Sequence, residues 1–223
     1  MEQLLKKKEE TYWNKNNVKL VGTIEEDLEF DNRVQRIDFY MTKIKVTRKS
    51  GKIDHIPLMI SEELLKNRNI QKSELKDKKV CIYGQFRTYD KNIPDGQFFV
   101  KMYVFVNKIH FCDFDIIVDN NITTIDGYIC KKPIFRITSL SKSKITQLLI
   151  AVNRKNDSVD YVPCIAWSKI AERSSKLKIG THVICKGRLQ SRKYPKKKMD
   201  EDGNVIVEWK ETYEMSIVKI HED

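Results

Sequence analysis

Residues 46–57, VTRKSGKIDHIP, have a close counterpart in residues 152–163, VNRKNDSVDYVP, and this pair of segments decides how the chain is organised. The two segments align without a gap at a spacing of 106 residues. The identical pairs are Val46/Val152, Arg48/Arg154, Lys49/Lys155, Asp54/Asp160 and Pro57/Pro163. A match of this kind between distant parts of one chain indicates an internal repeat.

Three further anchors follow the same order. LVGTI around Gly22 matches TIDGYI around Gly127 at a spacing of 105, and Gly84 in VCIYGQFRTY matches Gly187 in VICKGRLQSRKY at 103. The tripeptide KIH recurs at a spacing of 111. Because this period is longer than a solenoid unit, it indicates duplication of a whole domain. We therefore predict an N-terminal segment over 1–16, a divergent first domain over 17–118 and a second domain over 119–223.

Each repeat reads mainly as strands. In the second repeat, β-branched runs predict strands at 122–130, 145–154, 159–167, 182–192 and 205–220, and helical spacing predicts a helix over 168–178. Glycines inside strands are typical of the bulges and bends of a small barrel. Three strands, a helix and two strands are the order of the OB-fold. The first repeat has the same order with a longer helix candidate at 61–76. The predicted fold class is all-β, with one helix per unit, as two tandem OB-fold five-stranded Greek-key barrels.

The charge balance favours an anionic partner. The chain has 223 residues and a formal net charge of +11. Residues 1–118 have 22 basic and 18 acidic side chains, whereas residues 119–223 have 20 and 13. The basic excess therefore lies more in the second repeat, as expected of a nucleic-acid-binding surface.

Other classes of protein find little support. The five cysteines form no C-x-x-C pair and the four histidines are scattered, so we expect no metal, no cofactor and a reducing compartment. Phosphate-loop, H-E-x-x-H and G-x-S-x-G signatures are absent from the sequence, and we expect no enzymatic activity. The sequence has no secretory signal and no apolar run long enough for a membrane span, which predicts a cytoplasmic protein without membrane partners.

The second repeat contains an ordered series of segments: DGYICKKPIFR, LLIAVNR, DYVPCIAWSKIAE, KLKIGTHVICKGRLQSRKY and TYEMSIVKI, of which GRLQSRKY at 187–194 is the most specific. On this series, the second repeat resembles the bacterial single-stranded DNA-binding protein family. The resemblance covers nearly all of residues 120–221. The first repeat matches loosely, since Ile60–Glu63 replace the aromatic-x-K-x-A-E run. Chains of this family usually end in a flexible tail with an acidic tip, and the ending KIHED predicts that this recruitment tail is absent.

Binding of single strands without sequence choice needs cations for phosphates and flat rings for bases. The resemblance implies stacking at Tyr161, Trp167 and Tyr194, and Trp209 is a further candidate; packing in the core is the alternative for Tyr161 and Trp167. On a strand, Lys186, Arg188, Gln190 and Arg192 share one face by alternation. Arg154 either contacts phosphate or pairs with Asp160. The basic run without an intervening acid consists of Lys186, Arg188, Arg192, Lys193, Lys196, Lys197 and Lys198.

The first repeat offers weaker candidates: His55, Arg87, Tyr89 and Lys91. Its main role could instead be an interface.

We therefore expect non-sequence-specific single-stranded DNA binding in replication, recombination or repair, by a protein associated with the bacterial nucleoid. By analogy with one-domain relatives that form tetramers, we expect a homodimer with four barrels. Two alternatives stay open: an accessory OB protein that acts mainly through protein contacts in a primosome or recombination complex, and an RNA-binding OB protein.

Overall fold

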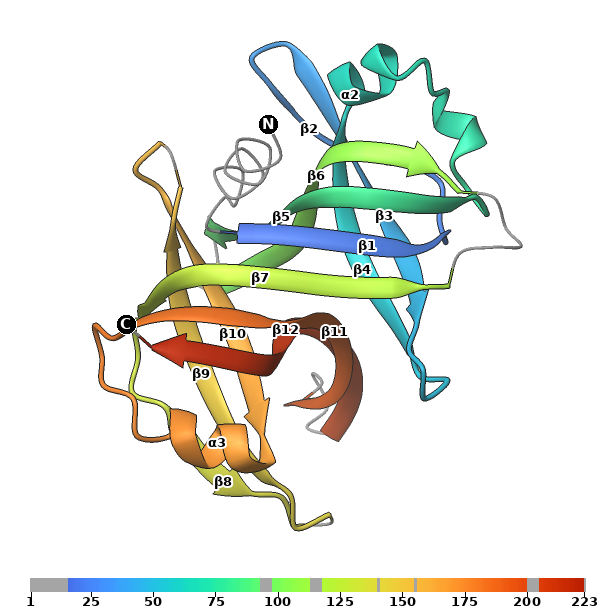
Figure 1. Ribbon diagram of the computed structural model, residues 1–223. Helices are drawn as coiled ribbons and strands as arrows, with labels where there is room; N and C mark the ends of the chain where they lie inside the picture. The colour runs from blue at the N-terminus through green and yellow to red at the C-terminus, as the bar shows by residue number, and fades with distance from the viewer. Residues whose placement is uncertain are drawn as a thin grey trace.

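The computed structural model describes residues 16–92, 98–112, 118–139, 141–154, 156–199 and 205–222, which form two consecutive barrels (Figure 1). The first barrel consists of β1 (Asn16–Ile24), β2 (Glu29–Val34), β3 (Ile37–Thr47), β4 (Ile53–Ser61), α2 (Glu62–Asn67), the 3₁₀ turn η1 (Lys72–Glu74), β5 (Lys79–Asn92) and β6 (Phe98–Phe111). The second consists of β7 (Asn120–Ile129), β8 (Ile134–Ile137), β9 (Lys144–Asn153), β10 (Val159–Trp167), α3 (Ser168–Ser174), β11 (His182–Met199) and β12 (Val205–Glu222).

Strand pairing closes each barrel in the OB order. The first barrel runs β3-β4-β6-β5-β1, and β1 returns to β3 through Thr23 opposite Lys45. The second runs β7-β11-β12-β10-β9, and β7 returns to β9 through Tyr128 opposite Ala151. In each barrel a short helix separates the third and fourth barrel strands. The predicted fold class, two tandem all-β OB barrels, is confirmed.

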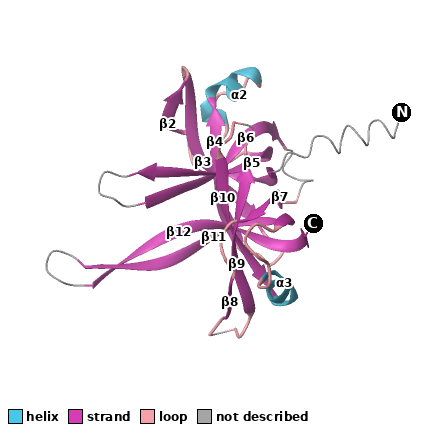
Figure 2. Cartoon of the chain, turned by 90° about the vertical axis from the view of Figure 1, so that its left-hand side faces the viewer, coloured by secondary structure: helices cyan, strands magenta, loops and turns pink. Residues whose placement is uncertain are grey.

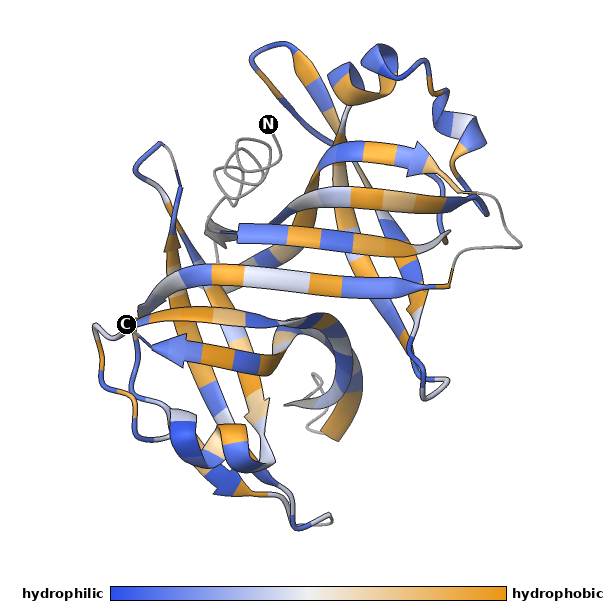
Figure 3. Ribbon diagram, in the orientation of Figure 1, coloured by the Kyte–Doolittle hydropathy of each residue, from blue (hydrophilic) through white to orange (hydrophobic). Residues whose placement is uncertain are grey.

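Apolar and polar residues alternate along the strands, as the colours in Figure 3 show, and the apolar side chains fill the barrels. On β9, Leu148, Ile150 and Val152 are buried, while Leu149 and Ala151 between them are only partly covered. Two of the anchor glycines lie where strands approach closely. A Cβ on Gly127 would lie 2.3 Å from the Ala151 carbonyl oxygen, and one on Gly187 would lie 2.1 Å from that of Ser216. A side chain at either position would therefore block closure of the second barrel.

The barrels share one sheet. β1 and β7 pair antiparallel from Asn16 opposite Ile125 to Val21 opposite Asn120, and they lie side by side at the centre of Figure 1. The sheet therefore continues from β2 through both barrels to β8. The predicted domain boundary near residue 118 falls between β6 and β7.

The structure differs from the sequence-based prediction in several elements. The predicted longer helix at 61–76 is wrong: α2 ends at Asn67, Asn69 adopts a left-handed φ of +51°, and only η1 follows. Asparagine tolerates this conformation better than most residues, so the chain can leave the helix there. The helix predicted over 168–178 ends at Ser174, and the short strands β2 and β8 were not predicted. Within the described residues, no helix is long and apolar enough to span a membrane.

Two long hairpins extend beyond the barrels. The barrel pairing of β6 with β4 includes Val104, and that of β12 with β10 begins at Met215. We define the first arm as β5 from Arg87 and β6 up to Tyr103, and the second arm as β11 from Gln190 and β12 up to Glu214. Figure 2 shows the second arm, β11–β12, projecting far from the body of the molecule.

Candidate nucleic-acid interface

The outer face of β10 presents two aromatic rings. Tyr161 and Trp167 are 46% and 39% exposed, whereas Val162, Cys164 and Ala166 between them point into the core. Six residue steps along the strand separate the two rings, which corresponds to about 20 Å. Both rings are therefore available on one face, at a separation that suits two different bases of one strand rather than a stacked pair of side chains.

The neighbouring strands add a cation that the sequence analysis missed. Trp167 lies opposite Ile145 on β9, and Ile145 lies opposite Arg136 on β8. Residues directly opposite each other in antiparallel strands share a face, so Arg136 lies in the same row as Trp167. Arg136 is exposed. The alternating tetrapeptide IFRI after Pro133 was the available signal, but four residues give too short a pattern to identify a strand.

The second arm contains the next group of candidates. The Arg192 guanidinium lies 5.9 Å from the centre of the Tyr194 ring, and Trp209, opposite Pro195, is 67% exposed. Tyr194 is half-buried. Strand β12 also brings acids beside the basic run, because Glu211 lies opposite Lys193 and Glu214 is 4.0 Å from Arg192. The cations that the linear sequence shows uninterrupted are thus partly balanced across the hairpin.

The remaining cations of β11 differ in exposure. Lys186 is exposed, whereas Arg188 is half-buried and Gln190 is buried with its amide bonded to Glu214. Burial alternates up to Leu189, since Gly187 and Leu189 are buried, whereas Gln190 and Ser191 are both buried and both contact the first barrel. The candidates Lys91, Lys196, Lys197 and Lys198 lie on β5 and β11, but their side chains fall outside the described part of the structure.

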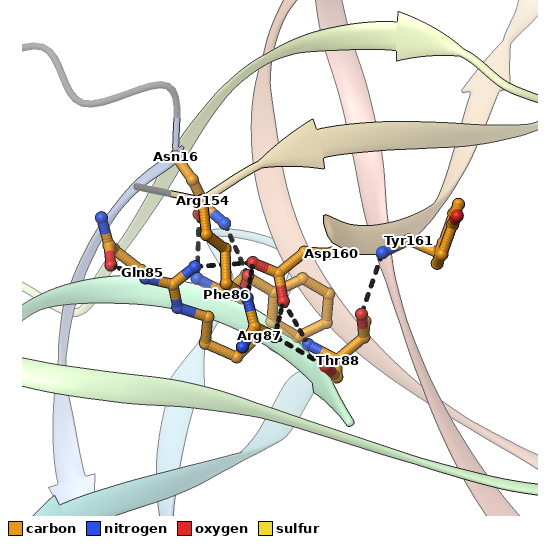
Figure 4. Close-up of polar contacts among 8 residues, drawn as sticks. All are labelled: Asn16, Gln85, Phe86, Arg87, Thr88, Arg154, Asp160 and Tyr161. Carbon is orange, nitrogen blue, oxygen red and sulfur yellow. Dashed lines mark hydrogen bonds and ion pairs between the residues drawn. The ribbon is translucent and has the colours of Figure 1, made fainter. Parts of the chain in front are cut away.

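Arg154 pairs with Asp160 in a network that joins the two barrels (Figure 4). Asp160 is fully buried and accepts hydrogen bonds from Arg154 Nε at 2.9 Å and from Arg87 Nη1 at 2.7 Å. The backbone N–H of Thr88 donates to the same carboxylate at 2.9 Å, and the N–H of Tyr161 donates to Thr88 Oγ1 at 2.9 Å. The hydrogen bond to Asp160 raises the pKa of Arg154. Arg87 and Arg154 therefore hold the barrels together.

The first repeat makes the corresponding network with the second arm. Buried Asp54 accepts two hydrogen bonds from Arg48, at 2.5 and 2.6 Å, and one from the N–H of Ser191 at 3.2 Å. The N–H of His55 donates to Ser191 Oγ at 3.1 Å, and His55 Nδ1 lies 2.8 Å from Glu25 Oε2. Of the weaker candidates, Tyr89 is 56% exposed on the first arm, whereas His55 sits within this contact.

The base of each arm thus packs on the other barrel. Arg87 and Thr88 of the first arm contact β10, and Gln190 and Ser191 of the second arm contact Arg48 and β4. We call this arrangement the reciprocal clasp. The sequence analysis missed it, although the signal was present: the repeated Arg and Asp in residues 46–57 and 152–163 form its two centres.

Comparisons with known proteins agree with this architecture. Residues 120–215 match the model of the single-strand binding protein family. The fold resembles crystal structures of the single-stranded DNA binding protein from Thermus aquaticus. A deletion mutant of that protein has a TM-score of 0.69 at 15% identity, covering 93% of this chain and 94% of that chain. The wild-type form has a TM-score of 0.68 at 16% identity, covering 93% and 92%. A comparison with curated protein sequences gives no match.

The fold defines a tandem OB protein, and Tyr161 and Trp167 give its second barrel an exposed aromatic face. Residues 120–215, which make up most of the second barrel, match the single-strand binding protein family, and the resemblance seen in the sequence is confirmed. This is a family of DNA-binding proteins rather than enzymes.

Proposed function

We propose that this protein binds single-stranded DNA without sequence preference, mainly through the outer face of β8, β9 and β10. The observation that carries the proposal is the pair of exposed rings, Tyr161 and Trp167, on one face of a family-type barrel. Stacking on an aromatic ring is worth about 1–3 kcal/mol per base and tolerates every base. The same face includes Arg136, which can contact a phosphate between two stacked bases.

The second arm extends this surface. Its exposed Arg192, Lys193 and Trp209 provide further cations and a further ring. Binding that depends on such cations weakens as salt rises, because phosphate contacts release counterions. On this proposal Arg87 and Arg154 act in the reciprocal clasp and not on phosphate, since the carboxylate of Asp160 already engages both.

The test is a titration of the full chain into a fluorescent oligo-dT strand at two salt concentrations, with duplex DNA and poly-U as competitors. The decisive variant combines Tyr161→Ala with Trp167→Ala, which removes both rings from the face. Loss of two stacked bases predicts a decrease in affinity of at least about 30-fold, from the lower limit of about 1 kcal/mol per base. Phe30→Ala is the matched control, since Phe30 is an aromatic residue that is 60% exposed on β2.

The outcomes separate the alternatives. Unchanged affinity in the double variant would refute the assignment of the binding face. Preference for poly-U over oligo-dT would indicate an RNA-binding protein. Weak binding by the unmodified chain to every strand would indicate an accessory protein that acts through protein contacts.

We propose further that the chain forms a homodimer of four barrels and acts in the bacterial cytoplasm, in replication, recombination or repair. The outer face of the shared sheet supports the dimer: Tyr83, Lys19 and Ile122 lie in one row across β5, β1 and β7, and Tyr128 follows on β7. Tyr83, Ile122 and Tyr128 are 39%, 39% and 43% exposed, and exposed apolar patches of this kind often mark interfaces. Light scattering that gives the mass of a monomer at micromolar concentration would contradict the dimer.

A further inference from the structure

A pocket lies at the junction of the two barrels, away from the aromatic face of β10. Its walls are the turn between β3 and β4, the start of β7 and the side chain of Arg188 on β11. The volume is about 390 Å³, which exceeds the size of a single phosphate group. Three cations line it: Arg48 and Lys49 from the first barrel and Arg188 from the second.

The carboxylates at this pocket are already engaged. Asp119 accepts a hydrogen bond from the N–H of Thr47 at 2.7 Å and forms an ion pair with Lys79 at 3.0 Å. Asp54, adjacent to the pocket, is held by the two hydrogen bonds from Arg48. Within the described residues, neither Lys49 nor Arg188 forms an ion pair, so the pocket retains a positive surplus.

Arg188 has an unsatisfied donor. Its Nε is buried and has no hydrogen-bond partner in the described structure. Buried donors in native proteins are nearly always paired, and a lone donor on a charged group is especially unfavourable. Burial, together with the neighbouring charge of Arg48, lowers the pKa of Arg188. The first barrel has no arginine at the equivalent position, since Gln85 follows Gly84 there, whereas Arg188 follows Gly187 in the second barrel.

We propose that this pocket binds a phosphate group through Arg188, with Lys49 and Arg48 providing additional positive charge. A phosphate oxygen is an acceptor that forms strong, charge-assisted bonds with a guanidinium group, and the Arg188 side chain lines this pocket. The phosphate could belong to the backbone of a single strand that passes from one barrel to the other, or to a free phosphate compound. The first source rests on the proposed function and the second does not.

The first experiment measures thermal unfolding of the full chain in increasing inorganic phosphate, with chloride at matched ionic strength as the reference. Binding to the folded state raises the unfolding midpoint with phosphate concentration in a saturable way. Arg188→Gln, which introduces the residue of the first barrel, should abolish the saturable shift while leaving a cooperative transition in chloride. Arg33→Gln, the same change at an exposed position on β2, should retain the shift.

The second experiment identifies the source of the phosphate. If a DNA backbone occupies the pocket, Arg188→Gln should weaken oligo-dT binding and make the slope of log K against log salt shallower by about 0.7. Loss of the phosphate shift with unchanged DNA binding would support a free phosphate compound. Equal shifts in the unmodified chain, Arg188→Gln and Arg33→Gln would overturn the proposal, because phosphate would then act only as a general stabilising salt. Should the unmodified chain not bind oligo-dT, the proposed function fails while the first experiment still decides this pocket.

Discussion

Asp160 is the residue whose removal should most clearly reveal the reciprocal clasp. Its carboxylate is fully buried and engages Arg87 from the first barrel, Arg154 from its own barrel and the N–H of Thr88. Asp160→Ala would leave two guanidinium groups facing each other without an anion. Removing one partner of a buried ion pair typically destabilises a protein by about 3–5 kcal/mol.

The loss of unfolding free energy expected for Asp160→Ala can be refined from the solvent exposure of its two arginine partners. The side chains of Arg87 and Arg154 are 20% and 22% exposed, so water can partly solvate them once Asp160 is gone. We therefore expect a loss near the lower limit, about 3 kcal/mol. For a chain of this length that loss corresponds to a decrease in melting temperature of about 6–12 °C.

A double-mutant cycle separates the contact between barrels from the contact within one. Arg87→Ala and Asp160→Ala, made singly and together, should give a coupling energy of about 1–3 kcal/mol in urea unfolding of the full chain. Asp27→Ala is the control, since Asp27 pairs with Lys76 at the surface and its removal should leave the unfolding midpoint unchanged. A loss below about 1 kcal/mol for Asp160→Ala, or a coupling near zero, would refute the clasp as a source of stability.

Three further results are expected. Gly187→Ala should destabilise the chain by at least about 3 kcal/mol in urea unfolding, because the new Cβ would overlap a backbone oxygen. Gly51 has a φ of +79° but open space around it, so Gly51→Ala should cost only about 1–2 kcal/mol. Equal losses of unfolding free energy in the two variants would contradict the steric argument. Burial raises the pKa of Cys164 and raises that of Cys185 to about 12, so both thiols should resist maleimide until the chain unfolds. Because the unfolded thiols ionise near pH 9.0, the unfolding free energy should fall as pH rises from 9.0 towards 12; labelling in the native state, or a flat profile, would argue against their burial. Oligo-dT affinity should fall with salt at a slope of about −3 if four phosphates are contacted, and a slope near zero would exclude the electrostatic contribution.

The barrels were predictable because each barrel strand follows a local rule. Alternation along 145–154 and 159–167 identified β9 and β10, and the anchor glycines identified the points of closure. The broken helix after Asn67 was not predictable from spacing, since Ile70 and Leu75 continue an apolar pattern beyond the turn at Asn69. A periodic pattern reports which side chains need burial, but several backbone paths can bury them.

The binding candidates were harder to predict, because exposure depends on what covers a face. Alternation placed Arg188 and Arg192 on the same face of β11, and both looked equally available for phosphate. The first barrel covers one end of that face, so Arg188 is half-buried while Arg192 stays exposed. In the same way, the acids opposite the basic run could not be seen in residues 186–198, because the register of β11 against β12 sets them there.

The reciprocal clasp also explains why the repeat is so clear at residues 46–57 and 152–163. In a duplicated barrel, core positions can exchange one apolar residue for another, so similarity there fades readily. Arg48 with Asp54, and Arg154 with Asp160, each form a buried ion pair that also receives a backbone N–H from the other barrel's arm. Replacing one member alone leaves a buried charge without its partner. The two clasps differ in the residues of their arm strands: Gln85 and Arg87 of the first repeat correspond to Arg188 and Gln190 of the second. Because of this difference, Arg188 lies beside the phosphate pocket proposed above.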